Sequence, residues 1–387
     1  MKLKKLYTTY KGVQIPRDRT SVNYDIAYLH YGDIYKIYNT RLNLNAELST
    51  IIKISKTETI KPFQYLIHGD IVMNLTSENY EDLGKSLIII NPDNIPLVAG
   101  METHILRTTS QDVISTYMQY FFESSEFSRQ ISQYAYGMKV FRAKPNHFGE
   151  IDLSLPTLDV QQHIVDTIGS VDDLIEKIIL QNKKIFKLIY LEFDNLIFDY
   201  DEITFSYYDF VKIITSGIHK FENNKIYIDT ASVSDHEIIS TEYLISHYNR
   251  PSRANMQPLS NSSWIAKLKD SPKYIKVDEY SHHEIDEMIF STGFLGLICI
   301  NKYVNNYIYT LISSDRFQEQ KNRVSVGATM QSINNDVFKS LLVPNIKLDE
   351  IEIFGKLVDA YYQNIHKNSR KIKELRLLKA QLLDKFF

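Results

Sequence analysis

The chain has 387 residues, of which 44% are hydrophobic and 24% charged, so it is long enough for two or three domains of a soluble globular protein. Its single cysteine, Cys299, excludes an intramolecular disulfide and predicts a reducing compartment, the cytoplasm. A net charge of −3 argues against a uniformly basic nucleic-acid binder, and the lack of an apolar run of about 18 residues argues against a membrane protein.

The first 150 residues, 1–150, predict a mixed α/β domain. Short strands are expected at 26–38, 50–54, 86–90 and 95–99. Gly-Asp pairs at 32–33 and 69–70 predict turns before apolar strands. A helix is expected over 109–129, after which the chain turns at Gly137.

A long helix is predicted within 151–198, where apolar residues recur at alternating steps of four and three, the spacing of a coiled-coil seam. The seam consists of Ile164, Ile168, Val171, Ile175, Ile178, Asn182, Ile185 and Ile189. Asp159 follows Pro156 and has Gln162 three residues later, which is the spacing of an N-terminal capping box. A long helix with one apolar seam needs a partner.

Residues 199–343 predict a second mixed α/β domain. Strands are expected at 226–230, 238–240, 275–277 and 296–300. The polar segment 250–263 predicts a loop. A helix over 307–316 is followed by Gly327, as the helix of the first domain is followed by Gly137.

The partner helix is predicted within 344–387. Its seam consists of Val358, Tyr361, Ile365, Asn368, Ile372, Leu375 and Leu382, and Lys379 interrupts it. Pro344 precedes this helix, and Asp349 with Glu352 repeats the cap spacing. Segments 164–198 and 353–387 match at an offset of 189 residues.

These patterns predict an α+β fold, in which two mixed α/β domains are separated by two long helices that form an antiparallel coiled coil, with an internal pseudo-twofold repeat. Two unrelated amphipathic helices are the alternative. Asn182 and Asn368 each lie near the middle of a helix. An antiparallel pair brings the two amides together, whereas the alternative leaves each facing solvent or a partner protein.

Signatures of catalysis and metal binding are missing from the sequence, including the GxxxxGK[ST] phosphate loop and the GxGxxG dinucleotide turn. His282 and His283 are expected to lie on the surface and not to bind a metal, because adjacent residues rarely coordinate one ion. The segment 91–94, Asn-Pro-Asp-Asn, lacks the aromatic residue of the amino-methyltransferase motif and predicts a turn. We therefore expect no catalytic residue, metal or cofactor in this chain.

Basic residues are concentrated in two segments. Segment 129–144 has four basic residues and no acidic one, and segment 249–276 has six basic residues and one acidic one. Arginine and lysine bind phosphates or guanine, while amides pair with adenine. The candidate DNA contacts are Arg129, Tyr136, Lys139, Arg142, Lys220, Arg250, Arg253, Arg316, Arg323, Thr329 and Gln331. For each residue alone a solvated surface position is the simpler interpretation, so the hypothesis rests on the clusters.

The order of several short motifs resembles a known family over essentially the whole chain. These are HYGDIY at 30–35, HGDIV at 68–72, SSEFSRQISQYAYGMKV at 124–140, PTLDVQQ at 156–162, SSDRFQEQKNRVSVGATMQSI at 313–333, LLVPNI at 341–346 and RLLKAQLLDKFF at 376–387. In this order they resemble the specificity (S) subunit of type I DNA restriction–modification enzymes. The second copy departs from the first, with Asp349-Glu350 in place of Gln161-Gln162 and no Gly-Asp turn.

This resemblance implies a non-catalytic, sequence-specific DNA-binding subunit that serves host defence. Each globular half is a target-recognition domain for one part of a bipartite site in double-stranded DNA, and the helices separate the two domains. Two methyltransferase (M) subunits dock on the helices, and restriction (R) subunits join them. S-adenosylmethionine, ATP and magnesium are then expected on those partner subunits.

Two other function classes remain open from the residues alone. A coiled-coil scaffold that joins proteins without touching DNA agrees with the acidic net charge. A fused enzyme with a divergent catalytic centre would bind S-adenosylmethionine as an isolated chain.

Overall fold

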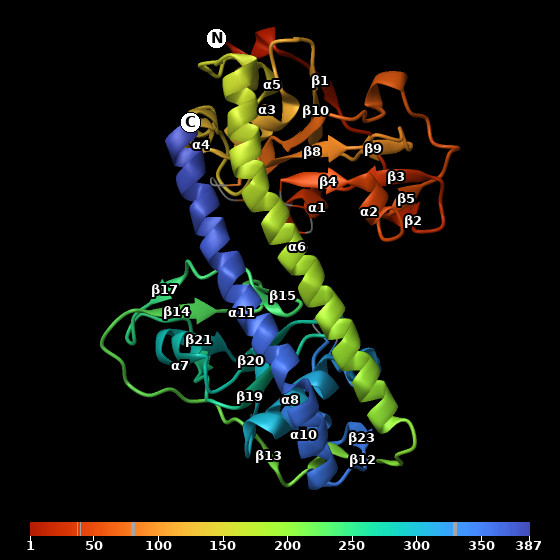
Figure 1. The fold of residues 1–387 in the computed structure, drawn as a ribbon, viewed down its shortest axis with the longest axis vertical. Coiled ribbons are helices and arrows are strands. Elements are labelled where there is room, and N and C mark those ends of the chain that lie inside the picture. The colour runs from red at the N-terminus through yellow and green to blue at the C-terminus, as the bar shows by residue number, and fades with distance from the viewer. Residues whose placement is uncertain (37, 39, 79–81, 328–330) are drawn as a thin grey trace. The chain divides into compact units, whose positions relative to one another are not determined.

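The computed structural model describes residues 1–36, 38, 40–78, 82–327 and 331–387. The chain forms two compact units, and each contains parts of both long helices. Unit 1 consists of Met1–Glu176 and Lys373–Phe387, and unit 2 of Lys177–Ile372. The predicted fold class is confirmed, because each unit is mixed α/β and two helices of 40 and 39 residues accompany the sheets (Figure 1).

Unit 1 is built on a five-stranded sheet in the order β1-β10-β6-β8-β4 and a four-stranded sheet in the order β2-β5-β3-β9. Its strands are β1 (Tyr7–Lys11), β2 (Thr20–Ser21), β3 (Ile26–Leu29), β4 (Arg41–Asn43), β5 (Lys53–Ile54), β6 (Ile71–Asn74), β7 (Thr76–Ser77), β8 (Ser86–Ile90), β9 (Leu97–Ala99), β10 (Thr103–Thr108) and β11 (Phe141–Arg142). Its short helices are η1 (Leu3–Lys5), η2 (Arg17–Arg19), η3 (Pro62–Gln64), α1 (Tyr31–Lys36), α2 (Leu44–Glu47), α3 (Ser115–Glu123), α4 (Ser125–Ser132) and α5 (Pro145–Gly149). Leu29 and Leu97 of the smaller sheet share one buried cluster with Val72 and Leu87 of the larger, so the two sheets enclose a core.

Three predictions for unit 1 are wrong in detail. Segment 26–38 is not one strand, because the Asp33 carboxylate accepts the His30 N–H at 3.2 Å and the chain enters α1. The Gly-Asp pair at 32–33 therefore lies within α1 and does not form the predicted turn before a strand. The predicted helix over 109–129 is interrupted at Ser124, whose hydroxyl accepts the Phe127 N–H at 3.2 Å and thereby caps α4. The turn at 69–70 is confirmed, since Gly69 has a φ of +86° just before β6.

Unit 2 contains two four-stranded sheets, β13-β22-β19-β20 and β17-β14-β21-β18. Its strands are β12 (Glu202–Thr204), β13 (Val211–Ile213), β14 (Lys225–Ile228), β15 (Val233–Ser234), β16 (Glu237–Ile238), β17 (Leu244–Ile245), β18 (Ala254–Met256), β19 (Ser262–Ala266), β20 (Tyr274–Val277), β21 (Met288–Ser291), β22 (Phe294–Cys299) and β23 (Leu342–Pro344). Its short helices are η4 (Phe205–Tyr207), α7 (His282–Glu287), α8 (Lys302–Ser313), α9 (Asp315–Val324) and α10 (Asn335–Lys339). The order β13-β22-β19-β20 repeats the antiparallel order β1-β10-β6-β8 of unit 1.

Two predictions for unit 2 also need correction. The expected loop 250–263 contains β18 and the start of β19, because Ala254 and Met256 pair with β21. The helix expected over 307–316 begins at Lys302 and is interrupted at Ser314. The Ser314 hydroxyl accepts the Phe317 N–H at 3.3 Å, so it caps α9 as Ser124 caps α4 in unit 1.

The first long helix, α6 (Leu158–Ile197), begins one residue before Asp159. Asp159 therefore lies in the first turn and is not the N-cap that the sequence predicts. Gln162 donates to the Asp166 carboxylate at 2.7 Å along the helix and does not complete a capping box. The negative charge of Asp159 still favours this end, because a helix N-terminus carries a partial positive charge.

The second long helix, α11 (Leu348–Phe386), likewise begins before Asp349. Its first turn is closed by Glu350, whose carboxylate accepts the Lys347 N–H at 3.3 Å. Glu352 accepts a hydrogen bond from Asn301 at 2.7 Å instead of capping. The capping prediction fails here for the same reason, since the helix starts one residue earlier than the sequence indicates.

The internal repeat runs at an offset of 190 residues, the separation of Leu158 from Leu348, rather than 189. The predicted offset would align buried Ile164 with Ile353, whose side chain is 66% exposed. The observed offset aligns Ile164 with Phe354, which is 3% exposed. Alternating steps of three and four allow either alignment in the sequence, and burial decides between them.

Within unit 2 the two long helices pack antiparallel. Phe193 of α6 contacts Phe354 of α11 with ring centroids 5.9 Å apart, and the later residue Asn368 lies beside the earlier Asn182. The Asn368 side-chain amide donates to the Asn182 side-chain oxygen at 2.7 Å, which confirms the predicted pairing of the two amides. On this face of α11 Tyr362 is buried, whereas Tyr361, which the sequence predicts for the seam, is only half-buried.

Within unit 1 the helices are antiparallel as well. His163 of α6 meets Phe386 of α11 with ring centroids 6.3 Å apart, and Asp172 meets Lys379 at 2.9 Å. Lys379 also lies 2.7 Å from the Glu123 carboxylate of α3. The lysine that interrupts the predicted seam is therefore the centre of a buried ion cluster that joins both helices to α3.

Candidate nucleic-acid interface

A glycine-containing hairpin follows the serine-capped helix pair of unit 1. Tyr136 and Arg142 exchange two backbone hydrogen bonds, of 3.0 and 2.9 Å, and so close the loop between them. Gly137 has a φ of +120°, and a Cβ there would lie 2.0 Å from the Val140 carbonyl oxygen, so only glycine fits. We call residues 136–142 the unit 1 hairpin.

The unit 1 hairpin presents three of the predicted DNA contacts on one short segment. Tyr136 is 46% exposed, and Lys139 and Arg142 are exposed as well. Lys144, just after the hairpin, lies over the Tyr136 ring at 5.8 Å from its centroid. Cations beside an exposed aromatic ring are the residue types that contact nucleic-acid backbone and bases.

Unit 2 has a matching pair of backbone-bonded residues at the corresponding place. Val326 and Ser332 exchange backbone hydrogen bonds of 3.2 and 3.0 Å, and Gly327 has a φ of +132°. Thr329, a predicted DNA contact, lies outside the described residues. Gln331 is also a predicted DNA contact. It is half-buried, and its backbone carbonyl oxygen accepts the Lys269 N–H at 2.9 Å.

The fold of unit 2 brings Gln331 close to basic residues from distant parts of the sequence. Lys267, two residues before Lys269, donates its N–H to the Gly293 carbonyl at 2.9 Å. A Cβ on Gly293 would lie 3.0 Å from the Arg253 guanidinium. Burial, and next the nearby Arg253, lower the pKa of Lys267. Arg253, Lys267, Lys269 and Gln331 therefore form one group, the Arg253 cluster.

A cavity of about 140 Å³ adjoins the Arg253 cluster. It is lined by Ile214, Ser216, Met256, Lys267, Thr292, Leu295 and Asn335. The ammonium-bearing Lys267 is the one charged residue of this lining. The sequence pattern does not single out Lys267, because its position beside Arg253 depends on the pairing of β19 with β22.

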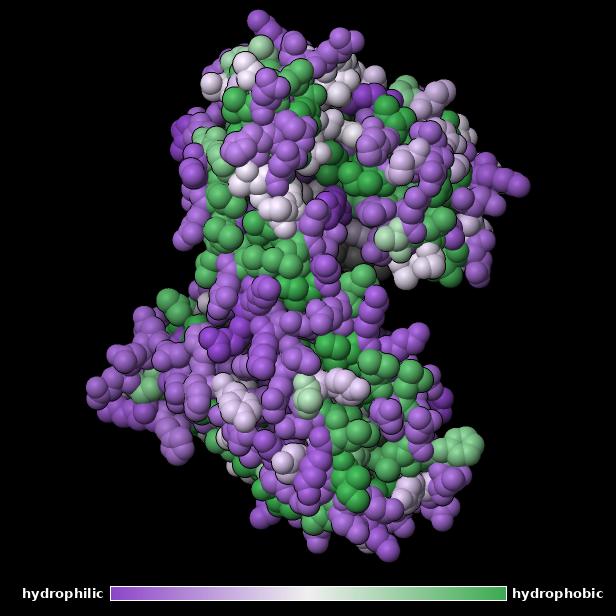
Figure 2. All heavy atoms as spheres, viewed as in Figure 1, coloured by the Kyte–Doolittle hydropathy of each residue, from purple (hydrophilic) through white to green (hydrophobic). Residues whose placement is uncertain are grey.

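Two further candidates of unit 2 lie elsewhere. Lys220 is exposed, and its ammonium lies 5.9 Å from the ring centroid of Tyr248. Arg250 donates to the carbonyl oxygens of His247 and Ala254, so it holds the turn before β18. Figure 2 shows that hydrophilic residues cover the lobe of unit 2 that carries β14, β17 and α7. A surface of this composition is solvated.

Three of the predicted arginines already have carboxylate partners. Arg129 pairs with Glu126 at 2.7 Å, and Arg323 with Glu319 at 3.3 Å. Arg316 pairs with Glu202 of β12. The Glu126 carboxylate raises the pKa of Arg129, which stays charged, but each pair is neutral as a whole. Their DNA contacts remain predictions.

Two lysines of unit 2 are buried and do not add to its surface charge. Lys276, counted in the basic segment 249–276, pairs with Asp278 at 3.4 Å, and burial lowers its pKa. Lys321 donates to the carbonyl oxygens of Ala266 and Ser271, and burial lowers its pKa to about 8. The exposed positive charge of this region is therefore smaller than the sequence indicates.

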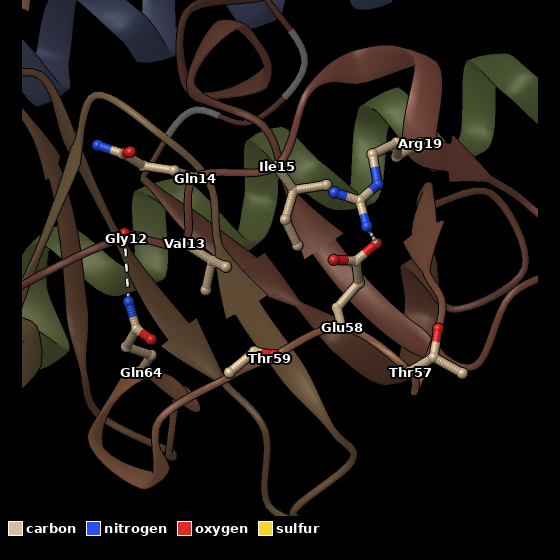
Figure 3. A pocket seen from close by; sticks show the side chains of 9 residues that line it. All are labelled: Gly12, Val13, Gln14, Ile15, Arg19, Thr57, Glu58, Thr59 and Gln64. Carbon is tan, nitrogen blue, oxygen red and sulfur yellow. Dashed lines mark hydrogen bonds and ion pairs between the residues drawn. The ribbon is translucent and has the colours of Figure 1, made fainter.

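A second, larger cavity lies in unit 1, with a volume of about 550 Å³. It is lined by Gly12, Val13, Gln14, Ile15, Arg19, Thr57, Glu58, Thr59 and Gln64 (Figure 3). Arg19 and Glu58 form an ion pair of 2.6 Å at one end, and Gln64 donates to the Gly12 carbonyl at 3.3 Å at the other. Its lining presents neutral amides and hydroxyls with one compensated ion pair, so it offers no net charge to a phosphate.

Among the described residues, no three or more His, Cys, Asp or Glu side chains are arranged to hold a metal ion. Cys299 is buried in β22, as a small core residue. In the same part of the chain, no helix is long and apolar enough to cross a membrane.

No protein-family model matches the chain. No curated protein matches it either.

Solved structures of similar fold exist at low sequence identity. A type I restriction–modification S subunit from M. genitalium is 13% identical, with 100% of this chain and 95% of that chain covered and a TM-score of 0.49. The HsdS subunit from Thermoanaerobacter tengcongensis is 13% identical, with 100% and 95% covered and a TM-score of 0.35. A structure concerning complex assembly and conformational transition of the type I R-M system is 13% identical, with 100% and 96% covered and a TM-score of 0.38.

Proposed function

We propose that this chain is the specificity subunit of a type I restriction–modification complex and that each unit reads one part of a bipartite DNA target. The observation that carries the proposal is the repeat of one structural element. Each unit has a serine-capped helix pair followed by a glycine with positive φ, with Ser124 and Gly137 in unit 1 and Ser314 and Gly327 in unit 2. Two copies of one element on a single chain suit a target with two separated parts.

The chemistry of the surface side chains supports DNA as the ligand. The unit 1 hairpin offers exposed Lys139 and Arg142 beside Tyr136, and unit 2 offers the Arg253 cluster, in which Arg253 is exposed and the other members are half-buried. Both sets combine cations for phosphates with aromatic or amide groups that can meet bases. Because these charges are local, a chain with a net charge of −3 can still bind DNA.

In this proposal the chain binds and its partners catalyse. S-adenosylmethionine, ATP and magnesium belong to the methyltransferase and restriction subunits. The long helices offer surface for such partners, since Leu180, Leu188 and Leu191 of α6 are 53%, 47% and 50% exposed. Leu188 and Leu191 follow Leu180 by eight and eleven residues, so the three side chains lie on one face of the helix. An exposed apolar stripe of this kind favours protein docking.

The experiment is a gel-shift selection from random duplexes, with this chain alone and with its methyltransferase subunits. The expected result is enrichment of duplexes that share two short fixed sequences separated by a spacer of fixed length. A complex that forms but enriches no sequence would contradict the proposal and favour a protein scaffold. Specific binding of S-adenosylmethionine by the chain alone would favour a fused enzyme.

A further inference from the structure

The tip of the unit 1 hairpin carries an apolar side chain in an unusual environment. Met138 is 96% exposed, more than any other large hydrophobic residue among those described. An isolated methionine on a surface gains free energy when a partner covers it, because burial removes apolar area from water. Its full exposure leaves the side chain free for a binding partner to cover.

The backbone holds Met138 in this exposed position. The two Tyr136–Arg142 hydrogen bonds close the loop, and Gly137 supplies the positive φ that the turn needs. Arg142 is also paired with Thr76 in the two-stranded sheet β11-β7. The next residue, Ala143, is buried and donates its N–H to the Leu75 carbonyl at 3.0 Å. The loop is thus fixed to the core of unit 1, and little ordering entropy is lost when a ligand binds.

The charges around Met138 identify the kind of partner. Within the described residues, no ion pair involves Lys139, Arg142 or Lys144, whereas Arg129 nearby on α4 is neutralised by Glu126. Segment 129–144 contains no acidic residue. A methionine tip on a segment whose cations have no ion-pair partner among the described residues suits a polyanion with an apolar interior, which describes the stacked bases and phosphates of double-stranded DNA.

We propose that the unit 1 hairpin is the element with which unit 1 enters a DNA groove, where Met138 makes an apolar contact with the bases. Lys139, Arg142 and Lys144 bind the phosphates on either side. This inference rests on the proposed function and deepens it. It assigns the contact with bases to one residue and the contacts with the DNA backbone to others. Tyr136, held beneath the Lys144 ammonium, forms the base of the hairpin.

The test separates base contact from phosphate contact in the complex with methyltransferase subunits. Binding is measured over a range of NaCl concentrations on the selected target and on two duplexes, each with one half of the target scrambled. Met138→Ala is expected to reduce discrimination against one scrambled half about tenfold and to leave discrimination against the other half and the salt dependence unchanged. Met138→Leu, which keeps the apolar volume, is expected to retain most of the discrimination.

The cations are expected to behave differently. Lys139→Ala should weaken binding to all three duplexes alike and reduce the slope of log affinity against log salt by about 1. Val22→Ala provides an apolar control, since Val22 is 52% exposed in the turn that follows β2 of unit 1. Lys56→Ala, at another exposed position of unit 1, provides the charge-matched control.

The outcomes distinguish the inference from the function on which it rests. If Met138→Ala keeps full discrimination against both scrambled halves while the wild-type complex discriminates, the base contact is disproved and the proposed function stands. If the wild-type complex binds all three duplexes equally, both are disproved. Equal loss of discrimination in Val22→Ala would also overturn the assignment to Met138.

Discussion

Replacing Lys379 with methionine is expected to lower the free energy of unfolding of unit 1 by about 3–5 kcal/mol, the usual result of removing one partner from a buried ion cluster. The Lys379 ammonium lies 2.7 Å from Glu123 and 2.9 Å from Asp172, and it donates to the Thr40 hydroxyl at 2.6 Å. Its side chain is 13% exposed and that of Asp172 is 10% exposed. Without the lysine, two carboxylates face each other with little access to water.

The loss is expected to shrink as the pH falls. Burial already raises the pKa of Asp172 above its usual 3.8, against the attraction of Lys379. Removing Lys379 raises that pKa further, so the folded state binds a proton that the unfolded state releases. Stability therefore increases as the pH falls through the folded pKa of Asp172 toward 3.8.

Urea denaturation of the variant at pH 8 and pH 5, followed by a probe in unit 1, measures both effects. Lys373→Met, at an exposed position of α11 in the same unit, is the matched control and should change stability little. Adding Glu123→Gln and Asp172→Asn to Lys379→Met should recover much of the loss. Equal stability of Lys379→Met and Lys373→Met would show that the buried cluster does not hold the helices to α3.

Asn182→Leu is expected to destabilise unit 2 by about 1 kcal/mol, at the low end of the cost of an unpaired buried polar group, because both amides are half-buried. Asn368 loses the oxygen to which it donates at 2.7 Å. Replacing both residues with leucine should recover much of the loss, since a leucine pair fills the seam without a polar group. A polar pair of this kind also fixes the register of two helices, so the double variant should loosen it.

A double-mutant cycle in urea measures the coupling of the two asparagines. Asn364→Leu, at an exposed position of α11, is the control for added hydrophobicity. If the two single-variant effects simply add, the amides do not interact in solution. In the proposed function, the loosened register should also broaden the spacer lengths that the complex accepts.

The long helices could be predicted from the sequence because one face must stay apolar over many turns. Every apolar residue of the predicted α6 seam, from Ile164 to Ile189, is buried. The serines at 124 and 314 could not be recognised as breaks, since serine is tolerated within helices and becomes a cap only when its hydroxyl bonds the backbone. The same limit applies to Asp159, which lies one residue inside the helix that it was predicted to cap.

The grouping of the candidate DNA contacts could be predicted for neighbours in the sequence but not for residues from distant segments. Tyr136, Lys139 and Arg142 come together because they are neighbours in sequence, whereas Lys267 joins Arg253 only through the pairing of strands. Burial of Lys276 and exposure of Met138 both depend on the path of the backbone. Burial of Lys321 likewise depends on the fold, since its partners are the carbonyl oxygens of Ala266 and Ser271, about 50 residues earlier in the chain.

Methylome sequencing of a host that expresses this chain with its methyltransferase subunits tests the proposed function most directly. The expected result is adenine methylation at a single bipartite motif, in which two short fixed sequences flank a spacer of constant length. Variants of the unit 1 hairpin should change one fixed sequence, and variants of the Arg253 cluster the other. Methylation without sequence preference, or a motif that is unchanged when this chain is omitted, would contradict the assignment of this chain as the subunit that reads DNA.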